Sequence, residues 1–128
     1  WLVIGFESGN QRILNFLHKG TTVEQNYKAA EICRKYGIKV FATFMMGLPT
    51  ETNQEVMDTI RMIRIIKPEH PSPFYFTPIP GTYIYDYCIE NKLSLRNDPF
   101  EIGRTGSWTP KIKGVDYKFL DEVRENLL

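Results

Sequence analysis

Hydrophobic residues occur in three short runs with little polar interruption, and each run is followed by a segment with helical spacing of apolar residues. The runs span residues 1–6, 38–46 and 74–77. The helical segments span residues 11–18, 22–36, 52–67, 83–91 and 116–128. Uninterrupted runs predict strands that are covered on both faces. Alternation of strand and helix predicts parallel strands joined by crossover helices, and therefore an α/β fold.

Two of the predicted helices begin with a possible capping box, in which a hydroxyl and a side chain three residues later bond each other's backbone N–H groups. The pairs are Thr21 or Thr22 with Glu24 or Gln25, and Thr52 with Glu55. Gly37 and Pro68 are expected to end these helices.

The composition is typical of a folded domain. The chain has 128 residues, of which 42% are hydrophobic and 24% charged, and its formal net charge is +1. A chain this close to neutral has no general electrostatic attraction for nucleic acid or an anionic membrane. No apolar stretch reaches about 18 residues, so we expect no membrane-spanning helix.

The sequence lacks the residues for a metal centre of its own. Cys33 and Cys88 are too few for a four-cysteine cluster or zinc site, and both are expected to be buried as small apolar side chains. His18 and His70 have no partners at ligand spacing. The chain begins at Trp1, inside a predicted strand and without a Met, so we expect it to be part of a longer protein.

Functional residues of parallel α/β folds gather at the carboxyl ends of the strands. Three segments qualify: 7–10, 43–51 and 77–82. Each combines a hydroxyl or carboxylate with a Gly or Pro that shapes a turn. Carboxylates there can accept hydrogen bonds from ribose hydroxyls, and the apolar surface of Met45 and Met46 can receive a purine. The pattern favours a nucleoside or polyhydroxylated ligand without naming it.

Each of these features also has a plain structural interpretation. Glu7 suits a solvated or capping carboxylate, and Thr43 can satisfy a neighbouring backbone group. Met45 suits a core and Gly47 a turn. Lys19 suits the carboxyl end of a helix, where the dipole favours a cation.

Taken together, four segments resemble the second half of the core of radical S-adenosylmethionine (SAM) enzymes. They are GFESG at 5–9, HKGTT at 18–22, FMMGLPTET at 44–52 and FTPIPGT at 76–82. Their order and spacing agree with that family over about residues 1–93. The resemblance implies a partial (half) TIM-like barrel of three parallel β/α units, strands four to six of a (β/α)6 core, at residues 1–93. A C-terminal loop and helix, residues 94–128, are expected to follow, and the resemblance does not extend to them.

The resemblance implies two cofactors, S-adenosylmethionine and a [4Fe–4S] cluster. In the family, three cysteines spaced C-x3-C-x2-C hold the cluster, and electron transfer cleaves SAM to a 5′-deoxyadenosyl radical. This sequence lacks that motif, so the cluster ligands are expected outside the chain. We therefore expect a radical SAM enzyme as the full-length parent and no turnover by this chain alone. No catalytic or metal-ligating residue is expected here, only one wall of the SAM site.

The resemblance implies SAM contacts at eight positions. Glu7, with Ser8 beside it, falls near the SAM ribose, and Lys19 near the SAM carboxylate. Thr43 falls at a ribose-proximal position where relatives often have Asp, so its contact is expected to be weaker. The positions that back or flank the adenine are Met45, Gly47, Thr77 and Pro78. Glu51 and Thr52 are expected to close this segment structurally.

The Glu-Ser-Gly sequence at 7–9 and Pro-Ile-Pro-Gly-Thr at 78–82 resemble the cobalamin-binding radical SAM group. Methylthiotransferases more often have Gln at the first position. The cobalamin-binding group includes methyltransferases and the anaerobic magnesium-protoporphyrin ester cyclase type. Cobalamin would be held by a domain outside this chain. The parent is therefore expected to carry out oxidoreductase radical chemistry or cobalamin-dependent methyl transfer.

The expected partners are a small-molecule substrate and the missing N-terminal half of the same protein, with no nucleic acid and no membrane. The strand at 1–6 would present an open apolar edge, which favours association with a second copy. A cytoplasmic, oxygen-sensitive parent is implied. Two alternatives stay open: another parallel α/β-barrel enzyme that binds a nucleotide or sugar, and a non-catalytic α/β scaffold for a protein partner.

Overall fold

The computed structural model describes residues 1–95 and 108–127, in two compact parts. The first part consists of residues 1–45 and 52–73, and the second of residues 46–51 and 74–128. Within the predicted tail at 94–128, residues 96–107 and 128 lie outside the described residues. Nowhere in the described ranges is a helix both long and apolar enough to cross a bilayer.

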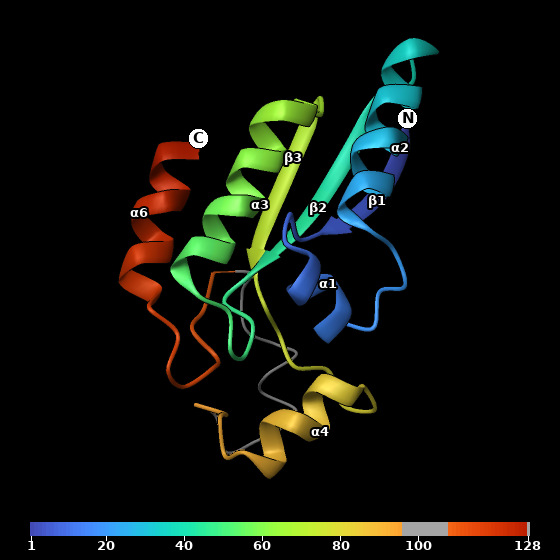
Figure 1. Cartoon of the computed structure of the whole chain (residues 1–128). Coiled ribbons are helices and arrows are strands. Elements are labelled where there is room, and N and C mark those ends of the chain that lie inside the picture. The colour runs from blue at the N-terminus through green and yellow to red at the C-terminus, as the bar shows by residue number, and fades with distance from the viewer. Residues whose placement is uncertain (96–107, 128) are drawn as a thin grey trace. The chain divides into compact units, whose positions relative to one another are not determined.

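The strands form an open sheet in the order β1-β2-β3, and helices alternate with them along the chain (Figure 1). The elements are β1 (Leu2–Glu7), α1 (Gln11–Phe16), α2 (Val23–Lys35), β2 (Val40–Met46), α3 (Asn53–Ile66), β3 (His70–Tyr75), α4 (Tyr83–Glu90) and α6 (Tyr117–Leu127). Because the strands are parallel and alternate with helices, the predicted α/β class and partial barrel are confirmed.

Both predicted capping boxes are present. The Thr22 hydroxyl accepts from the Gln25 N–H at 3.1 Å, and the Gln25 side chain accepts from the Thr22 N–H at 2.9 Å. Thr52 and Glu55 make the same pair of bonds at the start of α3. Each box satisfies N–H groups that a helix start otherwise leaves unpaired.

One face of the sheet is buried by helices and the other is half-exposed. Alternate side chains of β2 are buried, and those between them are only partly covered. Phe6 and Phe44 stack at 5.8 Å between ring centroids in the buried layer. Helices α2 and α3 lie on the same side of the strands (Figure 1). The half-exposed residues of β2 are Phe41, Thr43 and Met45.

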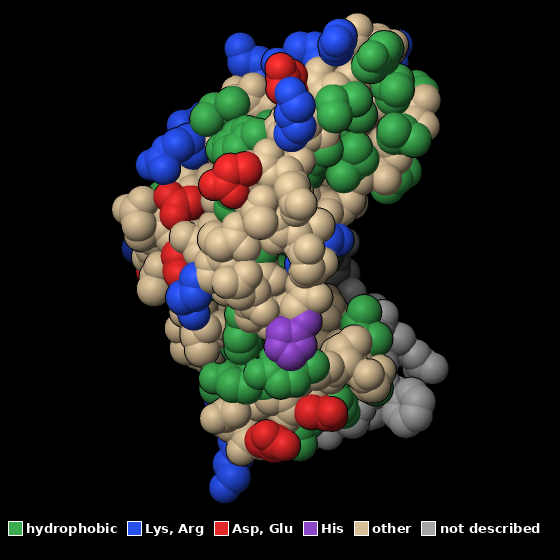
Figure 2. Space-filling view, turned by 45° about the vertical axis from the view of Figure 1, so that its right-hand side comes forward, with side chains coloured by type: hydrophobic (Ala, Val, Ile, Leu, Met, Phe, Trp, Pro, Cys, Tyr) green, Lys and Arg blue, Asp and Glu red, His purple; other side chains and the backbone are tan. Residues whose placement is uncertain are grey.

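The prediction that the first two strands are covered on both faces was wrong, because alternate residues of β2 are only partly covered and β1 is exposed at its beginning. Trp1 is 72% exposed and Val3 76% exposed. Exposed hydrophobic side chains gather where β1 and β2 begin (Figure 2). The reason is that β1 is at the edge of the described sheet, and Val3 pairs with Phe41 on the half-exposed face.

The predicted bounds of the third strand were also wrong. We expected residues 74–77, but β3 runs from His70 to Tyr75 and includes Pro71 and Pro73. Proline lacks the N–H group that a central strand needs, so prolines had seemed to bracket the strand. An edge strand tolerates them, and β3 is an edge strand of the described sheet.

The second part is built around the C-terminal helix α6. The Tyr75 hydroxyl donates to the Asp121 carboxylate at 2.5 Å, and the Tyr75 ring packs edge-on against Trp108. Burial and the Asp121 carboxylate raise the pKa of Tyr75, so its phenol stays protonated. The backbone N–H groups of Lys111 and Ile112 donate to the Tyr117 hydroxyl at 3.0 and 2.9 Å.

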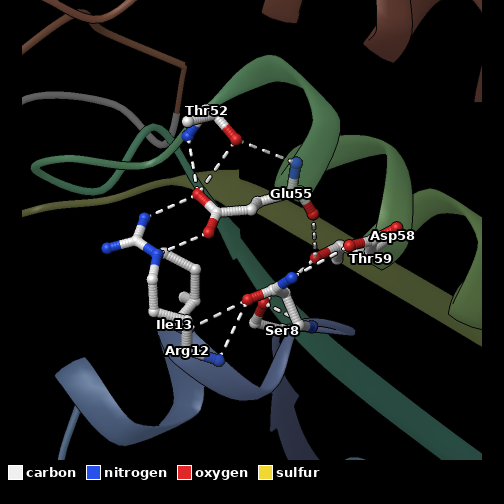
Figure 3. Close-up of polar contacts among 8 residues, drawn as sticks. Ser8, Arg12, Ile13, Thr52, Glu55, Asp58 and Thr59 are labelled. Atoms are coloured by element: carbon white, nitrogen blue, oxygen red, sulfur yellow. Dashed lines mark hydrogen bonds and ion pairs between the residues drawn. The ribbon is translucent and has the colours of Figure 1, made fainter.

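A bidentate ion pair ties α1 to the start of α3. Arg12 donates to the two carboxylate oxygens of Glu55 at 2.5 and 2.6 Å (Figure 3). The Thr52 N–H and hydroxyl also donate to Glu55, at 2.8 and 3.0 Å. The bonds from Arg12, with help from Thr52 and against the effect of burial, lower the pKa of Glu55 from 4.5 to about 2.

This shift predicts acid-sensitive stability. Because the folded-state pKa of Glu55 is depressed, its contribution is fully present above pH 4.5 and is lost as the pH falls toward 2. The loss is up to about 3 kcal/mol of unfolding free energy. Denaturant unfolding of Glu55→Gln, which keeps an amide for the capping box, should show much less change over this range.

The matched control is Glu31→Gln, which removes one partner of an exposed pair with Lys28. It should change the unfolding free energy by less than about 0.5 kcal/mol at any pH in this range. Equal pH dependence in the wild type and Glu55→Gln would contradict the assignment.

Candidate functional site

Strand β1 ends in a strained turn at Glu7. The φ angle of Glu7 is +65°, and the Ser8 N–H donates to the Phe6 carbonyl at 2.8 Å. These features define a three-residue γ-turn of the rare form with positive φ. The β1–β2 register also shifts there, since Gly5 pairs with Thr43 and Glu7 with Phe44. The turn therefore redirects the Glu7 side chain at the carboxyl end of the strand.

The Glu7 carboxylate folds back over Gly5 and meets Lys19. A Cβ atom at Gly5 would overlap Glu7 Oε1 and would lie 3.2 Å from Lys19 Nζ. Lys19 Nζ donates to Glu7 Oε1 at 3.2 Å, and the two side chains are 33% and 17% exposed. Lys19 lies beyond the last turn of α1. An accessible anion and cation are thus held together at one strand end.

The half-exposed face of β2 continues this group. Thr43 is paired with Gly5, and the side chains of Thr43 and Met45 are on the opposite face from the buried Phe44. The structure therefore brings four predicted residues of the first part to one face of the sheet. They are Glu7, Lys19, Thr43 and Met45.

Ser8 is placed differently. Its side chain is fully buried, and its hydroxyl lies 3.2 Å from the Thr59 hydroxyl (Figure 3). The Asn10 N–H donates to the same Ser8 oxygen at 3.1 Å. The Ser8 hydroxyl thus holds the loop after Glu7 to helix α3, on the inner side of the turn.

The second part contains the other predicted positions. Gly47 has a φ of +77°, and the Glu51 carboxylate accepts from the N–H groups of Gly47 and Leu48 at 2.7 and 3.2 Å. Glu51 therefore closes this loop as predicted, and Thr52 caps the next helix. The Phe76 N–H donates to the Met46 carbonyl at 2.8 Å. This bond brings the neighbours Gly47, Thr77 and Pro78 to the same strand ends.

Helix α6 closes the space beside Gly47, a contact that the sequence analysis missed. A Cβ atom at Gly47 would lie 3.0 Å from Leu120 and 3.2 Å from Val115. A substitution there is also strained by the positive φ. The only available signal was the amphipathic pattern at 116–128, which does not reveal what its apolar face covers.

Two other residues were missed, and both touch the Glu7 turn. Asn26 in α2 and Thr59 in α3 are 7% and 0% exposed, in positions within mainly apolar helix faces. A polar residue at helical spacing within an apolar face was the signal that could have identified them, because buried polar groups need partners.

An added methyl group should destabilise the protein more at Gly9 than at Gly5. In Gly9→Ala the new Cβ would lie 2.8 Å from the Thr59 Cα, so the loop must leave α3 at a cost of about 1–3 kcal/mol. In Gly5→Ala the Cβ meets only the ends of two flexible side chains, so the cost should be less than about 1 kcal/mol.

Denaturant unfolding measures both effects. In Gly5→Ala the smaller loss of stability should be accompanied by displacement of the Glu7 carboxylate. Carbon-13 NMR of that carboxylate can follow the displacement. Equal losses of stability in the two variants would show that the packing of this loop is described incorrectly.

Comparison with protein-family models matches residues 1–63 to the radical SAM superfamily. Among curated proteins, an uncharacterized methyltransferase of Pyrococcus horikoshii is 36% identical over 91 residues. This match covers 71% of the chain and 20% of the relative.

Two further relatives match almost the whole chain. The anaerobic magnesium-protoporphyrin IX monomethyl ester cyclase of Rubrivivax gelatinosus is 34% identical over 126 residues, 96% of the chain and 22% of the relative. A tRNA-2-methylthio-N6-dimethylallyladenosine synthase of Pelagibacter ubique is 27% identical over 124 residues, 94% of the chain. The chain spans 28% of that relative. The parallel strands and these matches agree with the four motifs, and the chain belongs to the radical SAM superfamily.

Proposed function

We propose that this chain forms part of the SAM-binding wall of a radical SAM enzyme that is longer than the chain itself. The observation that carries the proposal is the Glu7–Lys19 pair, which a strained turn holds over Gly5 at the end of β1. Family membership supplies the ligand, because S-adenosylmethionine and a [4Fe–4S] cluster are the cofactors of this family.

The charges of the pair are complementary to two groups of SAM. A carboxylate accepts hydrogen bonds from the ribose hydroxyls, which is the role we assign to Glu7. An ammonium group binds a carboxylate, which is the role we assign to Lys19. Without ligand each neutralises the other at 3.2 Å. Binding of SAM therefore exchanges one partly exposed ion pair for two complementary contacts.

The remaining predicted positions have supporting roles in the proposal. Thr43, paired with Gly5, offers a neutral hydroxyl near the ribose contact. Ser8 contributes through the loop that its hydroxyl ties to Thr59. We assign the adenine side to Met45, Gly47, Thr77 and Pro78.

The residues present do not fit the iron–sulfur cluster. Among residues 1–95 and 108–127, no three His, Cys, Asp or Glu side chains gather as a metal site. Cys33 and Cys88 are buried, and burial raises the pKa of the Cys88 thiol to about 11, so it stays protonated. We propose that the cluster ligands lie in the rest of the enzyme. A cluster bound there would supply the electron for the reductive cleavage of SAM.

For the parent enzyme we propose the cobalamin-binding subgroup. The match to the magnesium-protoporphyrin ester cyclase over 96% of the chain favours it, as does Glu at position 7. Cobalamin would be bound outside this chain, for oxidative cyclisation or methyl transfer. The match to a tRNA methylthiolation enzyme at 27% identity makes that chemistry the second candidate.

Three nucleosides test the assignment of the pair. In NMR titrations of the isotope-labelled chain, SAM should shift the signals of both Glu7 and Lys19. 5′-Deoxyadenosine, which keeps the ribose hydroxyls but has no carboxylate, should shift Glu7 as SAM does and shift Lys19 Nζ less than SAM does, because Lys19 then loses its partner Glu7 without gaining a carboxylate. 2′,3′-Dideoxyadenosine, which lacks both groups, should shift neither carboxylate nor ammonium. Identical shifts with all three nucleosides, or none at Glu7, would refute the assignment.

Anaerobic incubation with iron and sulfide tests the incomplete site. The isolated chain should form no [4Fe–4S] cluster by absorption and electron paramagnetic resonance, and chromatography should detect no 5′-deoxyadenosine after addition of SAM and reductant. A chain that assembles the cluster and cleaves SAM alone would show that the proposed division of ligands is wrong.

A further inference from the structure

Two buried polar side chains on neighbouring helices reach the turn at Glu7 from its two sides. Asn26 is at the end of the first turn of α2 and Thr59 in the middle of α3, and neither residue type favours a helix. Both are buried, which is costly for a polar group without a partner. Their hydrogen bonds therefore indicate why these residues are there.

Asn26 holds the residue before Glu7. Its Nδ2 donates to the Phe6 carbonyl at 3.1 Å, in a buried position. The same carbonyl accepts the Ser8 N–H that closes the γ-turn. Asn26 thus supplies a second donor to the atom on which the turn depends.

Thr59 holds the residues after Glu7. Its hydroxyl oxygen accepts from the Gly9 N–H at 3.0 Å. It also lies 3.2 Å from the Ser8 hydroxyl (Figure 3). A second link joins the same segment to α3, since Asn10 Nδ2 donates to Asp58 at 2.9 Å. The close approach of Gly9 to the α3 backbone leaves the loop little freedom to move.

The residue between these two anchors has the strained backbone. A non-glycine residue at positive φ is unfavourable and persists only where its surroundings fix it. The surroundings here are Asn26 on one side and Thr59 on the other, while the Glu7 carboxylate itself reaches the accessible face beside Lys19. Relaxation of the turn would restore the alternation of the strand and move the carboxylate away from Gly5.

We propose that Asn26 and Thr59 are positioning residues for the ligand contact of Glu7. They hold the γ-turn that aims the carboxylate, and neither touches the ligand. The identity of the ligand rests on the proposed function, whereas the control of the turn by these two residues does not.

The first measurement needs no ligand. The amide-to-α-proton coupling and the intraresidue nuclear Overhauser effect of Glu7 report its φ angle in the labelled chain. Positive φ should be lost in Asn26→Leu and in Thr59→Val, which replace each side chain by an apolar one of similar shape. Thr59→Ser, which keeps the hydroxyl, should retain it. Retention of positive φ in both apolar variants would overturn the proposal.

The second measurement separates positioning from general stability. Asn26→Leu introduces a better helix former of similar size, so the variant should remain folded. Its affinity for SAM should nevertheless fall on the order of tenfold, as expected for a lost hydrogen bond to a charged group. Ile63→Val, a buried change one turn after Thr59, should lower stability and leave SAM affinity unchanged. If the affinity for SAM fell in step with the free energy of unfolding across all the variants, a positioning role would be contradicted.

A double-mutant cycle tests whether Asn26 acts through Glu7. If Asn26 acts only through Glu7, Asn26→Leu should cause no further loss of SAM affinity in a Glu7→Ala background. Full additivity would overturn the proposal. If the wild-type chain shows no response of Glu7 to SAM or 5′-deoxyadenosine, the proposed function fails, and the ligand-free φ measurement still decides the role of Asn26 and Thr59.

Discussion

The first part of the chain depends on how the backbone leaves β1. At Glu7 the chain adopts a conformation that it would not keep alone, and the polar groups on either side of it are buried. Helices α2 and α3 satisfy those groups through Asn26 and Thr59. Because one loop must meet partners on two helices, the positions of both helices against the sheet are coupled to the conformation of one residue. The Arg12–Glu55 pair adds a third link between the loop side and α3.

The two parts solve a similar problem with different chemistry. In the first, the loop after β1 is fixed by side chains from distant helices. In the second, the loop after β2 is fixed by Glu51, only four residues from the Gly47 N–H that it binds. A local carboxylate closes a turn with little dependence on the rest of the fold, whereas distant partners require the helices to pack first. The loop after β1 should therefore form cooperatively with its helices, and the loop after β2 more independently of them.

The sequence predicted what depends on local pattern. Helix starts at Thr22 and Thr52, the buried stripe of α3 and the order of elements all follow from short-range rules. Through the family resemblance, the sequence also assigned Glu7 and Lys19 to the same predicted SAM site. It did not predict the bounds of β3, because Pro71 and Pro73 exclude a central strand and only the sheet order shows that β3 is at an edge. It did not predict the roles of Asn26, Thr59 and α6, since their partners are distant in sequence.

The prolines of β3 give the two sides of the sheet different capacities for growth. Alternate residues of a strand direct their N–H groups to the same side, so Pro71 and Pro73 remove donors from one side only. The inner side of β3 is paired with β2. The donors that the two prolines lack are therefore missing from the outer side of β3. The opposite edge, β1, has no proline and begins with exposed apolar residues. Any strand added to this sheet therefore finds a complete set of hydrogen-bonding groups beside β1 and an incomplete one beside β3.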